Sequence, residues 1–209
     1  MKSLILSLII LLSLHPCVFA WQGLAIEVQP DNGPIITVYY KGRNRCVRLY
    51  GIKVPRGPYA KDASFNVFCD ICICDQTVLS SITRDEIVND PMVQDAFRKV
   101  MRESGGHGSY QPVIDAILAA KVSHLLARCA KLFPRIQGNV TLDVTPMYTD
   151  KNGCTVALVG VNGMSLQEHL LKLGLAAVDP KTCHRKFCRD WKKLQNKARK
   201  SKMGMWSTH

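Results

Sequence analysis

The chain is short of acidic residues. Its Asp and Glu number 16 against 28 Lys and Arg, which gives a formal net charge of +12. The shortage is greatest near the C-terminus, because Lys181 to Lys202 contains ten basic residues and one acid, Asp190. Such an excess excludes a preference for cationic ligands and favours polyanions: nucleic acid, anionic lipid or acidic polysaccharide. The alternative interpretation is a solvated helix face with no ligand.

Long apolar runs are also scarce, and the one that exists lies at the N-terminus. A basic residue precedes the apolar residues 4–14, and Ala20 is a small residue at a suitable cleavage point. The run is shorter than the ~20 apolar residues that span a membrane, and the pattern is typical of a signal peptide over residues 1–20. We therefore expect a secreted or periplasmic protein with no transmembrane anchor after signal cleavage.

A second C-x-x-C motif is absent, although the chain has nine cysteines. Signal cleavage would remove Cys17 and leave an even number, which favours disulfides in an exported protein. The disulfide candidates are Cys46, Cys69, Cys72, Cys74, Cys129, Cys154, Cys183 and Cys188. Two alternatives stay open for residues 69–74, namely zinc ligation with His184 or His107 and a redox pair of Cys69 and Cys72.

Strand signals occur in two groups. Residues 24–28 alternate weakly, residues 35–40 are rich in β-branched and aromatic residues, and a turn then leads to a strand at 46–52. Pro55 ends this meander. Strands are expected again at 139–145 and 155–161, joined by the turn Asp150–Gly153. Cys46 and Cys154 fall on adjoining strands and are a candidate bridge.

Helical signals separate and follow these groups. The spacing predicts helices over 91–103 and 112–133, the second of which lies between the third and fourth strands. A capping box at Ser165 and Glu168 begins a short helix that Gly174 ends, and a final basic helix covers 183–202. This order predicts an α+β, mainly β fold: a five-stranded OB-fold barrel with C-terminal helices.

Three stretches resemble the thermonuclease (staphylococcal nuclease-like) family. They are Tyr40–Gly42 with Val47–Pro55, then Asp143 through the turn at Asp150–Gly153 to Ala176, and finally Trp191 to Ser207. The resemblance implies one OB-fold domain over residues 21–209. It also implies a family-atypical, helical, Cys-containing insertion at about 57–112.

Members of that family hold calcium with aspartates, activate water with a glutamate and stabilise charge with two arginines. At the matching positions this chain has Pro34 and Lys53 for the metal ligands, Arg56 for the base and Cys154 for one arginine. Arg48 alone keeps a catalytic position of the family. We expect that the calcium site is lost, that no metal or other cofactor is bound, and that the protein is a pseudoenzyme.

The leading hypothesis is electrostatic binding of nucleic acid or another polyanion. The residues expected to bind are Arg48, Lys53, Arg56, Arg185, Arg189, Lys192, Lys193, Lys197, Arg199 and Lys200. One alternative is an active secreted endonuclease that hydrolyses DNA or RNA phosphodiester bonds with a rearranged site. Its substitute groups would come from Glu27, Asp31, Asp62, Asp150, His107, His124 and His184. Another alternative is a protein-interaction module whose working surface is the insertion.

Overall fold

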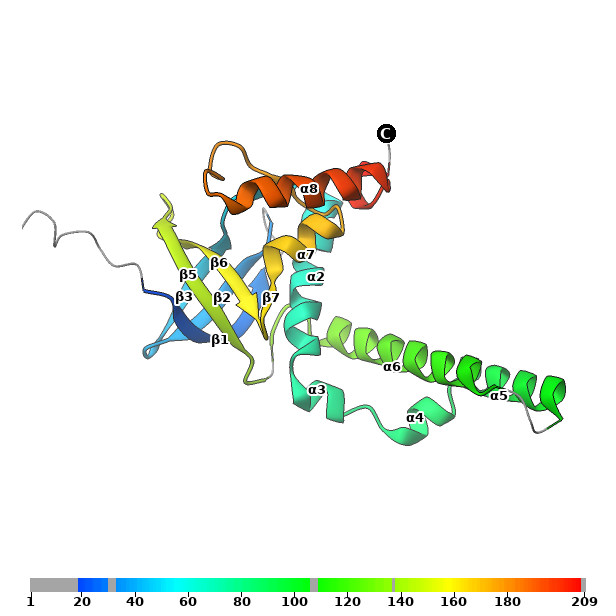
Figure 1. Cartoon of the computed structure of the whole chain (residues 1–209). Helices are drawn as coiled ribbons and strands as arrows, with labels where there is room; N and C mark the ends of the chain where they lie inside the picture. The colour runs from blue at the N-terminus through cyan, green and yellow to red at the C-terminus, as the bar shows by residue number, and fades with distance from the viewer. Residues whose placement is uncertain (1–18, 30–32, 106–108, 137, 208–209) are drawn as a thin grey trace, which may run out of the picture.

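The computed structural model describes residues 19–29, 33–105, 109–136 and 138–207 (Figure 1). Most of the expected signal peptide therefore lies outside the described residues, as do Asp31 and His107. Within the described ranges, none of the helices combines the length and apolar character that crossing a membrane requires.

The core of the fold is a closed five-stranded barrel. Its strands are β1 (Trp21–Gln29), β2 (Ile35–Tyr40), β3 (Arg43–Leu49), β5 (Thr141–Thr149) and β6 (Thr155–Val161), in the order β3-β2-β1-β5-β6. The neighbouring pairs are antiparallel, and a short parallel pairing of β3 with β6 closes the barrel. Two short strands, β4 (Ile52–Lys53) and β8 (Ala177–Val178), pair beside it, and β7 (Met164–Ser165) extends the sheet at β6. The predicted OB-fold barrel is confirmed.

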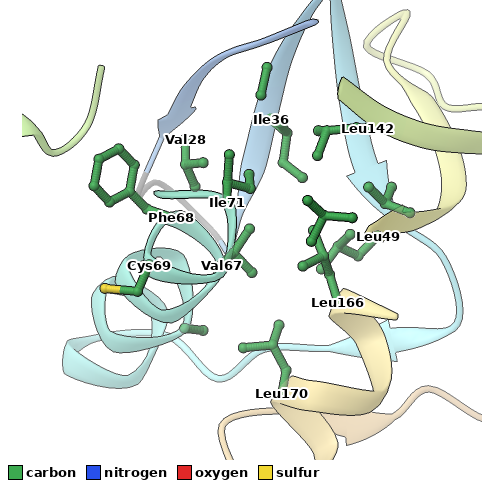
Figure 2. Packing of buried hydrophobic residues seen from close by; sticks show 14 of the residues in the cluster. Val28, Ile36, Leu49, Val67, Phe68, Cys69, Ile71, Leu142, Leu166 and Leu170 are labelled. Atoms are coloured by element: carbon green, nitrogen blue, oxygen red, sulfur yellow. The ribbon is translucent and has the colours of Figure 1, made fainter. Parts of the chain in front are cut away.

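Two helices cover the barrel and supply much of its core. These are α2 (Pro58–Ile73) and α7 (Leu166–Lys172). Figure 2 shows Val67 and Ile71 of α2 on the side of Ile36, with Phe68 beside Val28. All five side chains are essentially inaccessible to solvent. We expected residues 58–73 to belong to the insertion and residues 112–133 to form the helix between the third and fourth strands. Instead, α2 is the helix that packs on the barrel there.

The four helices between α2 and β5 lead away from the barrel. They are α3 (Gln76–Ser80), α4 (Arg84–Val88), α5 (Pro91–Ser104) and α6 (Gln111–Leu132), as Figure 1 shows. We call residues 84–132 the arm. Along most of its length α6 packs on α5 through a small separate core around Ala116 and Ala120, and only its end reaches the main core, through Leu125 and Cys129. The helix predicted at 112–133 thus exists, but it faces the barrel core over its last turns alone.

The C-terminal helices follow the prediction closely. The Ser165 side chain accepts a hydrogen bond from the Glu168 amide at 3.3 Å, which begins α7. Gly174 ends it with φ +69°, and the amides of Gly174 and Leu175 donate to Leu171 and Leu170 as in a Schellman motif. A side chain at Gly174 would also overlap the carbonyl of Met203. The turn therefore fixes where α8 (Phe187–Lys200) and the following 3₁₀ turn η1 (Gly204–Trp206) sit.

One buried carboxyl group lies between α2 and α7. Asp70 Oδ1 is 3.5 Å from His169 Nε2, while Oδ2 has no hydrogen-bond partner among the described residues. Burial raises the pKa of Asp70 from 3.8 to about 7. Burial, with Lys172 nearby, lowers the pKa of His169. The pair therefore lacks the full charges of a strong ion pair at neutral pH.

Replacing Asp70 by Asn is expected to stabilise the protein at pH 8. The folded state holds the Asp70 proton more tightly than the unfolded state does, because burial raises its pKa from 3.8 to about 7. The contribution of Asp70 to the free energy of unfolding therefore falls as the pH rises through this range and is lowest above about pH 7. The gain in Tm should be several degrees at pH 8 and should vanish towards pH 4, where Asp70 is protonated in the folded state. Measuring the Tm of both proteins by thermal unfolding between pH 4 and pH 8 tests this prediction. An equal change at both pH values would contradict the titration of Asp70.

Candidate functional site

A cationic cavity of about 1030 Å³ opens where β3, β4 and β8 meet the turn between β5 and β6. Its charged lining residues are four cations and one acid, namely Arg48, Lys53, Arg56, Lys151 and Asp179. The other lining residues are Ile52, Val54, Pro55, Asn152 and Ala177. The structure therefore brings together Arg48, Lys53 and Arg56, which the sequence singled out, and adds Lys151 from a distant turn.

An ion pair fixes the position of Arg48 in the cavity wall. Its Nε lies 3.1 Å from Asp150 Oδ2, and both side chains are partly buried. The other oxygen of Asp150 accepts hydrogen bonds from the backbone amides of Asn152 and Cys154, at 2.8 and 3.0 Å. Asp150 therefore holds the turn and the arginine together.

The acid on the cavity wall is also engaged in local bonds. Asp179 Oδ1 accepts the amide of Lys181 at 3.0 Å, and Oδ2 accepts the Thr182 hydroxyl at 3.1 Å. These bonds close the loop that follows β8. Both carboxylates near Arg48 thus have structural partners.

Two of the expected site positions carry no charge at all. Pro34 is buried, and Gly33 before it packs against Val54 in the cavity wall, so this segment adjoins the cavity. Cys154 is bonded to Cys46 across the barrel closure, with their Cα atoms 4.7 Å apart. The candidate Cys46–Cys154 bridge is thus present, and it includes a position where the resemblance implies an arginine.

The side chains of the cavity do not fit calcium. Calcium takes six to eight oxygen ligands from carboxylates, carbonyl groups and water at 2.3–2.6 Å. Here the carboxylates of Asp150 and Asp179 are already bonded, and four cations line the same space. Across the described part of the chain, no three His, Cys, Asp or Glu side chains cluster in a way that would hold a metal ion.

A second cationic surface lies on α8. Trp191 and Ala198 are buried, with Phe187 and Leu194 packed against the same core, which is the predicted apolar stripe. The helix begins at Phe187 rather than at the predicted Cys183, because the Cys183–Cys188 disulfide closes a loop before it. Seven of the ten basic residues expected to bind ligand lie on α8 or just before it, and all seven are exposed: Arg185, Arg189, Lys192, Lys193, Lys197, Arg199 and Lys200.

Side-chain and strand pairings connect α8 to the cavity. The Gln195 side chain accepts the amide of Val178 in β8 at 2.7 Å. In turn, β8 pairs with β4, where Ala177 faces Lys53. The helix and the cavity are therefore neighbours in the fold, although β4 and α8 lie far apart in sequence.

The alternative cysteine sites do not assemble. Cys72 is bonded to Cys129, which ties α2 to α6, while Cys69 and Cys74 are free thiols. Cys69 and Cys72 therefore form no redox pair with each other. Among the described residues, His184 does not complete a zinc site with these cysteines, because it lies on the loop before α8, where its Nε2 is 2.7 Å from the Lys181 carbonyl oxygen. His107, the other histidine expected there, lies outside the described residues.

The substitute acids and bases of the alternative nuclease are dispersed. His124 sits on the arm, 3.2 Å from Asp90. Asp62 is exposed on α2, Glu27 lies in β1, and neither lines the cavity. Of the candidates within the described residues, Asp150 is the one that pairs with Arg48, and its oxygens are bonded.

A second cavity, of about 550 Å³, opens in front of Tyr50 and was not predicted. Its lining includes Tyr148, Lys181, His184 and Arg185. The two tyrosine rings meet edge to face at 6.3 Å. Burial, together with the nearby Tyr50, Asp179 and Asp150, raises the pKa of Tyr148. The residues that line this cavity come from three separate segments, so spacing in the sequence gives no indication of it.

Comparison with known families agrees with this geometry. The family of staphylococcal nuclease homologues matches residues 131–208, from the end of α6 through η1. No curated protein matches the chain. The match contains Cys154 and α8 but stops short of the segment with Arg48, Lys53 and Arg56. The matched segment completes the five-stranded barrel, and over residues 131–208 the chain is similar to the staphylococcal nuclease homologue family.

Proposed function

We propose that this is an exported thermonuclease-like protein that has lost calcium-dependent phosphodiesterase chemistry and binds nucleic acid or another polyanion electrostatically. The observation that carries the proposal is the cavity beside Arg48, where Lys53, Arg56 and Lys151 are the neighbouring charges. Export is supported by the three disulfides, because such bonds persist in oxidising compartments.

The cavity supplies what a phosphate group needs. Arg48 is held in place by Asp150, so little side-chain entropy is lost when its guanidinium meets an anion. Two further lysines and Arg56 add donors and positive charge. Hydrolysis would also need a free base to activate water, and both nearby carboxylates are occupied.

The exposed face of α8 extends the basic surface beyond the cavity. Contacts of this kind neutralise phosphates and release counterions, so they carry no base specificity. We therefore expect binding to DNA and RNA of any sequence, with an affinity that falls steeply as salt rises.

The test uses the mature protein with its disulfides intact. Fluorescence anisotropy with labelled single-stranded and duplex DNA should show binding at about 50 mM salt and a 10³- to 10⁵-fold loss by about 200 mM. The same preparation, incubated with plasmid and calcium, magnesium, zinc or EDTA, should leave the DNA uncut. Metal-dependent cutting that disappears in Asp179→Asn or Asp150→Asn would overturn the loss of activity. Undetectable binding at low salt would overturn the ligand class.

Reversing the two cavity cations that replace family acids is expected to weaken DNA binding. The variant Lys53→Glu/Arg56→Glu should bind about 100-fold less tightly at 50 mM salt, since each lost phosphate contact costs about tenfold there. Lys99→Glu/Arg102→Glu is the matched control, because both residues are exposed on the arm and the net charge changes equally. Equal losses in the two variants would mean that net charge alone governs binding.

A further inference from the structure

The arm exposes an unusual amount of apolar surface. Of the fourteen large hydrophobic residues exposed in the described chain, nine lie on the arm. They are Val88, Met92, Phe97, Met101, Tyr110, Ile114, Leu118, Val122 and Leu126. Contiguous exposed apolar surface on a soluble domain is typical of an interaction site.

Four of these residues form a ridge on α6. Ile114, Leu118, Val122 and Leu126 recur every four residues, and Leu118 and Val122 are 57% and 53% exposed. On the opposite side of α6, Ala116 and Ala120 are buried against α5. The α5–α6 pairing therefore leaves the ridge open.

Nearer the barrel, the ridge side of α6 is covered by the protein itself. Leu125 and Cys129 are buried there in the main core, and the Cys72–Cys129 disulfide joins α6 to α2. Farther out, no described element covers it, and Figure 1 shows the arm extending beyond the barrel. The open part is thus the continuation of a face that already packs against a helix.

The spacing of the ridge indicates the kind of partner that fits. Residues four apart form the i±4n ridges that interdigitate when two helices cross at about −50°. The ridge is also self-complementary. In an antiparallel crossing centred at the level of residue 120, Ile114 faces Leu126 of the second helix and Leu118 faces Val122. Each β-branched side chain then meets a leucine.

Charge favours a second copy in that orientation. The arm holds seven Lys or Arg and six Asp or Glu, so +11 of the net +12 lies outside it. Because α6 joins the barrel at its C-terminal end, an antiparallel crossing puts the two basic barrels at opposite ends. A parallel crossing would bring them side by side, where like charges repel.

We propose that the protein is a homodimer whose two-fold interface is the α6 ridge of Ile114, Leu118, Val122 and Leu126, crossed antiparallel with the same ridge of a second copy. The interface is isologous, so it closes at two chains. It leaves α8 and the cationic cavity of both copies open.

The first test is the mass of the mature protein in solution. Sedimentation velocity from about 1 to 100 μM should show a dimer that dissociates on dilution. All chains carry Cys74→Ser, so that a disulfide through this free thiol cannot imitate the interface. Leu118→Glu should give a monomer at every concentration, with an unchanged circular dichroism spectrum. Ser123→Glu adds the same charge at an exposed α6 position off the ridge and should remain dimeric.

The second test addresses the register. Chains with Leu118→Glu and chains with Val122→Lys should each be monomeric, but their mixture should form a heterodimer, because residues 118 and 122 face each other. Recovery only when Leu118→Glu is mixed with Leu118→Lys would overturn the antiparallel crossing. A monomeric parent at 100 μM would overturn the dimer altogether, whether or not its ridge then binds lipid vesicles or another protein.

Discussion

Affinity for single-stranded DNA is expected to fall by about three to four orders of magnitude at 50 mM salt when Arg189, Lys192, Lys197 and Lys200 are all changed to glutamate. These residues are exposed on α8, opposite its buried Trp191 stripe. At this salt, each phosphate contact contributes about tenfold through counterion release. The slope of log affinity against log salt should also become shallower by about three to four. Anisotropy titrations at several salt concentrations measure both.

A matched variant separates the α8 surface from net charge. Glutamate at Arg84, Lys99, Arg102 and Lys131 makes the same charge change on exposed positions of the arm. We expect a much smaller loss of affinity, because these residues lie away from α8 and the cavity. If both quadruple variants lose affinity equally, α8 is not the binding surface and the long-range field of the whole protein is responsible.

The strands and the C-terminal helices were predictable because their signals are local. Capping by Ser165 and the left-handed conformation of Gly174 mark the two ends of α7. The apolar residues of α8 recur with a clear helical period: Phe187, Trp191, Leu194 and Ala198. Helix α2 lacks such a signal. Its buried residues run almost without a break from Ala63 to Cys72, apart from two half-buried positions, so the polar face that reveals a helix is missing.

The candidate site was predictable only in part, for a related reason. Arg48, Lys53 and Arg56 lie within nine residues of sequence, so one strand end brings them together. Lys151 and Asp179 join them through the closure of the barrel, which no local pattern encodes. The resemblance to thermonucleases singled out Lys53 and Arg56, which line this cavity, but it gave no account of the arm, which lies outside the matched segment except at its end.

Removing the Cys46–Cys154 disulfide is expected to have the largest effect on stability. The bond closes a loop of 108 residues, and the chain-entropy estimate for that length is about 4–5 kcal/mol. It also stands at the start of the parallel pairing of Val47–Leu49 with Thr155–Ala157, which is all that joins β3 to β6. For a chain of this size, Cys46→Ala/Cys154→Ala should lower Tm by roughly 10–20 °C.

The Cys183–Cys188 disulfide provides the comparison. Its two cysteines are five residues apart, for which the same estimate is about 2 kcal/mol, so Cys183→Ala/Cys188→Ala should lower Tm by roughly 4–8 °C. Calorimetry of both variants under the same oxidising conditions measures the difference. Equal losses would show that local packing, rather than closure of the barrel, sets the contribution of these bonds. The side chain of Asp150 binds Arg48 without involving the disulfide sulfurs. The Cys46→Ala/Cys154→Ala variant should therefore still bind DNA at temperatures below its lowered Tm.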